Sequence, residues 1–382
     1  MVSTHHPFSG VVSDVSEARS VADVLEMAPE FRTEISHGPV WYAPTVGCGS
    51  EAALVEESKD LTHLDRYSAV LGDGKPLGAI VGKGQGIRQP ILSLEDGQFL
   101  VDNLGAKWAA VGTTHNGLKT LVEVDLPQEA FSIQRGDRED HFKPRIVLPD
   151  ANDGSKSFDP TLLLHALLCS NEYPAIDAEN RRLRQKHTSG IAKRQGDARL
   201  FLVQAVERIA KERGVLQSME DTHMPQASFI EFAARLLTGK DKPEEALKVV
   251  AESEGRTEAT LKRKFETLET LFRKGTGNRG RTALDAFSAV TEWRTWGGQA
   301  DEDATLLARV QAQSLGRNLG TLVDDIATAT QSNRDAMDVV LTADERRRTE
   351  QRLHSNLSGN SAKMVARAQS LLLEYVDAPT AA

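Results

Sequence analysis

The sequence predicts an α+β fold in which a mostly antiparallel sheet with short helices is followed by a helical C-terminal region. Up to about residue 155, short apolar runs alternate with clusters of glycine, asparagine and proline, which is typical of strands joined by tight turns. Beyond that point, apolar residues recur every three or four positions, as on one face of a helix. The chain has 382 residues, 40% of them hydrophobic, which is enough for more than one core. We expect an α+β sheet domain over residues 1–155, a mixed and then helical region over 156–298, and C-terminal helices over 299–382.

Turn signals predict two hairpins in the first region. A short helix is expected first, over residues 20–27. The apolar runs 67–71 and 77–81 flank the segment GDGKP, whose glycines and proline favour a turn. The runs 108–111 and 120–124 enclose an Asn-Gly pair, which accepts positive φ at both turn positions and is the strongest hairpin signal in the chain.

The remaining elements of the first region are less regular. Residues 131–133 and 145–148 are expected to form strands. Ser93 with Asp96 resembles a capping box and predicts the start of a helix that ends near Leu104. Trp108 lies in an expected strand, where a tryptophan is usually part of the core.

Apolar stripes predict the helices of the second region. A stripe that reaches Ile209 is expected to stop at Gly214, and Ser228 with Glu231 forms a second capping-box pattern. Later stripes are Leu261, Phe265, Leu268 and Phe272, then Leu284, Phe287, Val290 and Trp293, and finally Met364, Ala368, Leu371 and Tyr375. The last helix is expected to begin at Ser361.

Composition restricts the classes of function. The chain has 46 Lys and Arg against 55 Asp and Glu, which gives a formal net charge of −9. This charge argues against a protein that coats nucleic acid with its whole surface, but it is compatible with a local basic face. Cys48 and Cys169 lie far apart, which excludes a disulfide scaffold and a cysteine-rich zinc site. The N-terminus lacks an apolar signal stretch, and the apolar run 162–168 is too short to span a bilayer. We therefore expect a cytoplasmic protein with no membrane segment, and we expect no cofactor and no metal.

Three segments carry a resemblance to a known family. They are Asp153-Gly154-Ser155 between two strands, Leu168-Cys169-Ser170-Asn171 with the later His187-Thr188, and the run GNRGRTALDAFSAVTEW over residues 277–293. Over residues 21–295 the chain thereby resembles the phage- and plasmid-related family catalogued as domain of unknown function 932 (DUF932). That family places an arginine shortly before its cysteine, where this chain has Leu163-Leu164-His165. The resemblance implies an origin in a mobile element and no established activity.

The last of these segments has a chemical interpretation of its own. Its glycines and arginines form a loop that leads directly into a helix. A loop of this kind can approach a phosphate or another backbone closely, because glycine adds no side chain and a helix N-terminus attracts anions.

Basic residues gather in two parts of this acidic chain. The first part holds Arg181, Arg182, Arg184, Lys186, Lys193, Arg194 and Arg199, and the second holds Lys262, Arg263, Lys264, Arg273, Lys274, Arg279 and Arg281. Such segregation is informative, but it fits a nucleic-acid surface and a solvated helix face or exposed loop equally well. We predict phosphate contacts from Arg181, Arg182, Arg184, Lys186, Lys193, Arg194, Arg279 and Arg281, with Trp296 stacking on a base.

Three other patterns give weaker indications. The glycine-rich segment 82–86 around Lys83 follows a strand and could cradle a phosphate, but it lacks the P-loop and Rossmann spacings and also fits a flexible turn. A metal-dependent nuclease would use Asp137, Asp140, His141 and Asp153, whose spacing matches no known ligand pattern. Cys169 would share a helix face with His165, although a lone cysteine is usually a small buried hydrophobe.

Together these observations favour an accessory protein that binds single-stranded or partly unwound DNA in recombination, repair or replication without ATP. Phage single-strand annealing proteins, which join a small sheet to helices and act as homo-oligomers, are the functional analogy. A protein-interaction module that opposes host defence or restriction is the alternative, because an acidic surface can compete for a basic groove. A metal-dependent nuclease is the second alternative.

Overall fold

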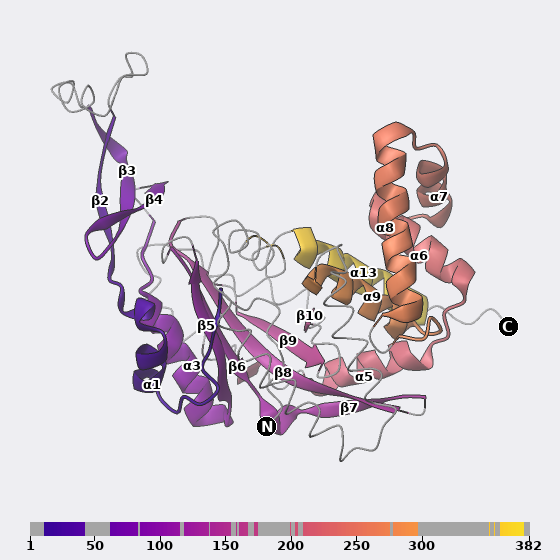
Figure 1. The fold of residues 1–382 in the computed structure, drawn as a ribbon, viewed down its shortest axis with the longest axis horizontal. Coiled ribbons are helices and arrows are strands. Elements are labelled where there is room, and N and C mark those ends of the chain that lie inside the picture. Colours follow the sequence, from indigo (N-terminus) through magenta and orange to yellow (C-terminus); the bar gives the residue numbers. More distant parts are fainter. Residues whose placement is uncertain are drawn as a thin grey trace, which may run out of the picture.

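The computed structural model confirms the α+β prediction, with sheets in the first part of the chain and helices in the second (Figure 1). The structure describes residues 11–42, 62–82, 85–114, 118–136, 138–153, 158, 160–166, 172–174, 199, 203–204, 209–275, 278–296, 351, 355 and 360–377.

A seven-stranded sheet forms the centre of the molecule. Its strands are β1 (Ser13–Asp14), β5 (Lys107–Thr114), β6 (Lys119–Asp125), β7 (Phe131–Arg135), β8 (Arg138–Ala151), β9 (Thr161–Ala166) and β10 (Glu172–Pro174). The order is β1-β5-β6-β8-β9-β10, β7 pairs with β8 alone, and every pairing is antiparallel. The expected hairpin of β5 and β6 is confirmed, with Trp108 opposite Val124 and Thr114 opposite Lys119. Its Asn-Gly tip lies outside the described residues.

Two helices cover one face of this sheet: α1 (Val21–Met27) and α3 (Pro90–Leu104), with the 3-10 turns Pro29–Arg32 and Pro127–Glu129 beside them. α1 confirms the helix expected over residues 20–27, and Ser20 closes its N-terminus with a capping box. Trp108 is buried beneath α3, as expected. Gly97 permits this close approach, because a Cβ at that position would lie 2.7 Å from the Trp108 ring.

α3 begins earlier than the sequence pattern indicated. Ser93 does not cap it, since Pro90 is the first residue of the helix and Ser93 lies inside it, buried. Proline is favoured at this position because its ring presets φ and the missing N–H would have no helical partner. The predicted end at Leu104 is confirmed, and Gly105 follows with a φ of 63°.

A second sheet projects from the body as an arm, formed by β2 (Ile35–Tyr42), β3 (Thr62–Gly72) and β4 (Lys75–Gly82) (Figure 1). β3 and β4 confirm the hairpin predicted around GDGKP. Asp73 and Gly74 form its turn with φ values of 50° and 76°. Two successive positive φ values match the twist of the flanking strands.

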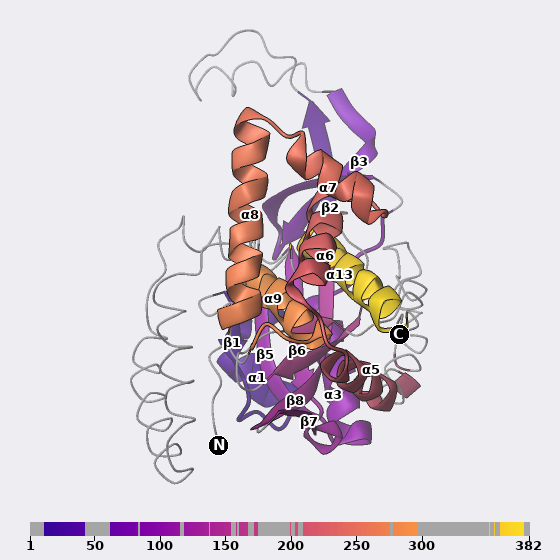
Figure 2. The ribbon, with the colours of Figure 1, turned by 90° about the vertical axis from the view of Figure 1, so that its right-hand side faces the viewer.

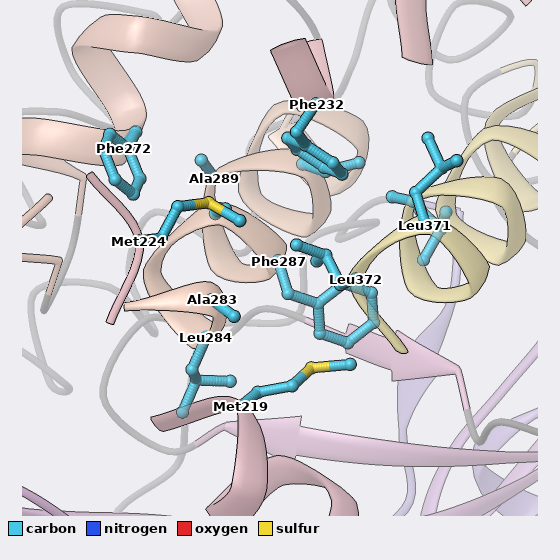
Figure 3. Packing of buried hydrophobic residues seen from close by; sticks show 14 of the residues in the cluster. Met219, Met224, Phe232, Phe272, Ala283, Leu284, Phe287, Ala289, Leu371 and Leu372 are labelled. Atoms are coloured by element: carbon cyan, nitrogen blue, oxygen red, sulfur yellow. The ribbon is translucent and has the colours of Figure 1, made fainter. Parts of the chain in front are cut away.

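The second half of the chain is helical, as predicted. Its described helices are α5 (Ile209–Asp221), α6 (Gln226–Thr238), α7 (Pro243–Ala251), α8 (Gly255–Lys274), α9 (Ala283–Trp296) and α13 (Asn360–Asp377). α9 lies at the centre of the core that these helices share. Figure 3 shows Phe287 of α9 beside Leu372 of α13, and Phe232 of α6 belongs to the same core. The same core includes Ile133 and Phe142 of the sheet, so helices and sheet are packed together.

The apolar stripes predicted for α8, α9 and α13 are confirmed. A predicted helix end in α5 and a predicted helix start in α6 are wrong. α5 continues through Gly214 to Asp221. Ser228 lies inside α6, which begins at Gln226 directly after Pro225. α6, α7 and α8 form a helical finger that rises from the body toward the same side as the arm (Figures 1 and 2).

Candidate nucleic-acid interface

The longest described helix, α8, presents a basic face to solvent. Its apolar stripe faces the core, where Leu268 and Phe272 are buried and the Phe272 ring stacks on Phe229 with centroids 4.1 Å apart. This contact anchors the C-terminal half of α8. The N-terminal half belongs to the projecting finger, where most side chains are exposed.

α8 carries six basic residues and three acidic ones. Arg256, Arg263 and Lys274 are exposed and lie on the side of the helix opposite the core. Arg256 and Lys274 are separated by five helical turns, a distance of about 27 Å, and Arg263 falls on nearly the same line. We call these three residues the α8 stripe.

The residues directly in line with the α8 stripe are uncharged, and Glu266 lies to one side of it. Thr260 and Thr267 lie along the same line, and their hydroxyls donate hydrogen bonds back to the carbonyls of Arg256 and Arg263 at 2.8 and 2.9 Å. The hydroxyls are thus occupied within the helix. The face that remains is cationic, and it extends over the whole length of α8.

The segment 278–282 connects α8 to α9 and closes the N-terminus of α9. Thr282 Oγ1 accepts a hydrogen bond from Asp285 N at 3.1 Å, and the Asp285 carboxylate accepts bonds from the N–H groups of Arg281 and Thr282. Ala283 N donates to the Thr222 carbonyl at 3.0 Å. The Asp285 carboxylate therefore already occupies the helix end that would otherwise attract an anion.

A buried arginine holds this closure in place. Arg135, at the end of β7, is only 2% exposed and forms ion pairs with Asp140 at 2.9 Å, with Glu220 at 3.3 Å and with Asp285. Asp285 is fully buried. One guanidinium therefore joins β7, β8, α5 and α9. Charges withdrawn from water in this way are tolerable only when they are paired and hydrogen-bonded.

Glu220 has a shifted pKa within this centre. Burial raises the pKa of its carboxyl above the usual value, and the neighbouring Asp285 raises it further, while Arg135, Arg279 and a hydrogen bond from Thr282 act in the opposite direction. The net direction is upward. The stability that this group contributes is therefore complete below its unfolded pKa and is lost as the pH rises through its folded pKa.

The two arginines predicted in this segment have different positions. Arg279 turns inward and pairs with Glu220 at 2.7 Å, which leaves 32% of its side chain exposed. Arg281 is exposed. The segment lies against the last turn of α8, since a Cβ on Gly280 would be 3.2 Å from Arg273 Cα. Arg281 thus extends the basic surface of α8, and Arg279 serves mainly as an internal partner.

Comparison with protein families gives one match. The family model described as "Domain of unknown function (DUF932)" matches residues 79–367. The chain belongs to this family. The DUF932 match begins within β4 and ends within α13, so it starts later than the resemblance over 21–295 and extends further toward the C-terminus. No curated protein and no solved structure matches the chain.

The DUF932 region contains the central sheet apart from β1, and it also contains the finger and both sides of the Arg135 centre. The predicted contacts Arg181, Arg182, Arg184, Lys186, Lys193 and Arg194 lie outside the described residues, as do Lys83, Cys169 and the side chain of Trp296. Among the helices that are described, none has the length and hydropathy needed to cross a bilayer.

The structure separates the acidic residues that were grouped as a nuclease candidate. Asp140 points into the Arg135 centre, while its neighbours Glu139 and His141 point to the opposite face because side chains alternate along a strand. Asp153 pairs with Lys119 at 3.3 Å. Asp137 lies outside the described residues. Where the structure describes the chain, no three His, Cys, Asp or Glu side chains are placed to hold a metal ion.

His165 lies in a strand, β9, and not in a helix. The helical spacing that would place it on one face with Cys169 therefore does not apply. An apolar run of this length cannot be assigned to a strand or a buried helix from its pattern alone, and here the pairing with β8 decides in favour of the strand.

A second buried arginine, Arg88, escaped the sequence analysis. It is 3% exposed, pairs with Asp96 and with Asp150 at 3.3 Å, and lies 4.0 Å from the centre of the Phe158 ring. Arg199, predicted as part of a basic surface, pairs with Asp96 at 3.2 Å. A single charged residue of this kind follows no periodic pattern in the sequence, so only its ion pairs in the folded structure show its role.

Proposed function

We propose that the protein binds DNA through phosphate contacts along α8, as an accessory protein of recombination, repair or replication that works without ATP. The observation that supports this most directly is the α8 stripe together with the exposed Arg281 at its base. Exposed cations in a row on a projecting helix attract a polyanion, although the whole chain is acidic. The basic segment 181–194 remains part of the proposal.

The proposed substrate is single-stranded or locally unwound DNA, and the arm supports this choice. Tyr67 is 50% exposed and Ile80 is 62% exposed. Because Tyr67 pairs with Gly82 and Ala69 pairs with Ile80, both side chains lie on the same face of the three-stranded sheet. An exposed aromatic ring on an open sheet suits base stacking, which requires unpaired bases.

A salt titration tests the phosphate contacts. Binding of the full chain to oligothymidylate and to a duplex of equal length is measured by fluorescence anisotropy from low to physiological salt. In the triple variant Arg256→Gln, Arg263→Gln and Lys274→Gln, three contacts are lost, so the slope of log affinity against log salt becomes shallower by about 2. Affinity at low salt falls on the order of tenfold.

A matched control removes the same charge elsewhere. Lys107, Lys211 and Arg213 are exposed and lie outside the α8 stripe, so their replacement by glutamine should leave the slope unchanged. Absence of binding to either oligonucleotide at low salt near pH 7 contradicts the proposed function. Equal slopes for the wild type and the stripe variant contradict the role of α8, and alanine at Arg181, Arg182 and Arg184 then tests the other basic segment.

A further inference from the structure

Arg294, in the last turn of α9, is partly buried, and its partners differ from those of the buried arginines that the structure describes. Arg88, Arg135 and Arg145 each form ion pairs with at least two carboxylates. The guanidinium of Arg294 faces the thioether of Met364 on α13, with Nε 3.0 Å from Sδ and Nη2 also directed at it. Within the described residues it has no carboxylate partner.

The surroundings of Arg294 compensate its charge only in part. Its guanidinium carbon lies 4.5 Å from the centre of the Trp293 ring, a cation–π contact. Its place in the last turn of α9 allows a favourable interaction with the helix dipole. A thioether is a weak acceptor. Burial lowers the pKa of the Arg294 guanidinium, and no nearby anion opposes this effect.

The Arg294 side chain is partly exposed, so solvent reaches part of it. Its Nη1 forms no hydrogen bond within the described residues. All three guanidinium nitrogens therefore lack an oxygen acceptor in the described part of the chain. Inorganic phosphate offers four oxygens and a backbone phosphodiester two non-bridging ones, and either can accept the paired N–H groups of a guanidinium. The flexible Met364 side chain can move aside.

We infer that Arg294 forms an anion site for a phosphate group, with Trp293 and Met364 as its apolar walls. The planar guanidinium can bind two phosphate oxygens at once. The phosphate comes either from free inorganic phosphate or from a nucleic-acid backbone. The inference does not depend on the α8 stripe, because Arg294 and its neighbours belong to α9 and α13.

Replacing Arg294 with methionine distinguishes a ligand site from a structural arginine. The variant has a shorter, unbranched apolar side chain and removes a partly buried charge that lacks an anion. In phosphate-free buffer we expect its Tm to exceed that of the wild type by roughly 2–4 °C. Sodium phosphate, added at constant ionic strength, should raise the Tm of the wild type and leave that of Arg294→Met unchanged. Arg294→Lys should respond weakly, because lysine is a point charge.

A matched control and two further ligands complete the experiment. Arg235→Met removes a partly buried arginine that pairs with Glu374 at 2.8 Å, so it should lower the Tm and keep the phosphate response. If oligothymidylate also raises the Tm of the wild type more than that of Arg294→Met, the phosphate belongs to a nucleic-acid backbone. If only inorganic phosphate raises the Tm in this way, the site binds the free ion. A lower Tm for Arg294→Met without phosphate overturns the inference. An equal phosphate response in both proteins, or a response to acetate in place of phosphate, also overturns it.

Discussion

Replacing Arg135 with methionine should destabilise the protein more than any surface change, because three carboxylates depend on this one guanidinium. Asp140, Glu220 and Asp285 are at most 8% exposed. Removal of the cation takes one ion pair from each of these buried carboxylates, while Glu220 keeps its pair with Arg279. The variant thus contains buried negative charge that water cannot solvate.

The size of the effect follows from this geometry. Breaking a buried ion pair by removing one partner costs about 3–5 kcal/mol. We expect a loss of about 4 kcal/mol in the free energy of unfolding, a large part of the roughly 5–15 kcal/mol that holds a typical domain folded. For a core of this size the Tm should fall by roughly 8–16 °C.

Urea denaturation followed by circular dichroism at pH 7 and pH 5 measures this loss. In the variant the carboxylates bind protons more readily in the folded state, so the deficit should narrow as the pH falls. Arg273→Met is the control, because Arg273 is 53% exposed and pairs with Glu269 at the surface, where such pairs contribute about 0–1 kcal/mol. A loss below about 1 kcal/mol for Arg135→Met, or a deficit that widens at pH 5, would refute the reasoning.

Two more substitutions test the packing and the charges of the sheet. Gly97→Ala should destabilise by about 1–2 kcal/mol in urea despite the better helix propensity of alanine, because the new Cβ meets the Trp108 ring. In Gly214→Ala of α5 the new Cβ has no other atom within 4 Å, so this variant should be more stable than the wild type by about 1 kcal/mol. A change in stability of the same sign in both variants would contradict this account. Burial acts to raise the pKa of Asp125, but Arg145 and Lys143 lower it below the usual value overall. Asp125 therefore stabilises the fold above its unfolded pKa and loses this effect as the pH falls through its folded pKa. Asp125→Asn should lower the free energy of unfolding by about 1.5–3 kcal/mol at pH 7. When this free energy is measured at decreasing pH, the difference between variant and wild type should shrink toward pH 3. A difference that stays constant would count against the ion pair.

Regular patterns in the sequence predicted most of the elements. The stripe from Leu261 to Phe272 predicted α8, because residues three and four apart share one face of a helix. Both hairpins followed from their turn residues. One error concerns a helix end, because α5 continues through Gly214. Two concern helix starts, where Ser93 and Ser228 resemble caps while Pro90 and Pro225 mark the actual beginnings. These prolines were a local signal that could have corrected the prediction.

The candidate site was predictable only in part. Most basic residues of α8 stood out in the sequence as a run of charge. That three of them line up on one side of the helix could be seen only once the helix and its buried face were known. The inward turn of Arg279 depends on Glu220, which is 59 residues away. Arg294 resembled any other arginine in the sequence, and only the packing of α13 on α9 placed a thioether where a carboxylate would be expected.

The sequence by itself determined the fold class, the family and the uneven distribution of charge, because periodicity, turn chemistry and motif are properties of neighbouring residues. The tertiary structure alone decided which cations face solvent and which are consumed in ion pairs. Arg135 meets Asp285 across 150 residues of sequence, and no local pattern specifies such a contact. Burial and pairing arise when distant segments pack together, so the charges that remain free to bind a partner emerge only in the folded chain.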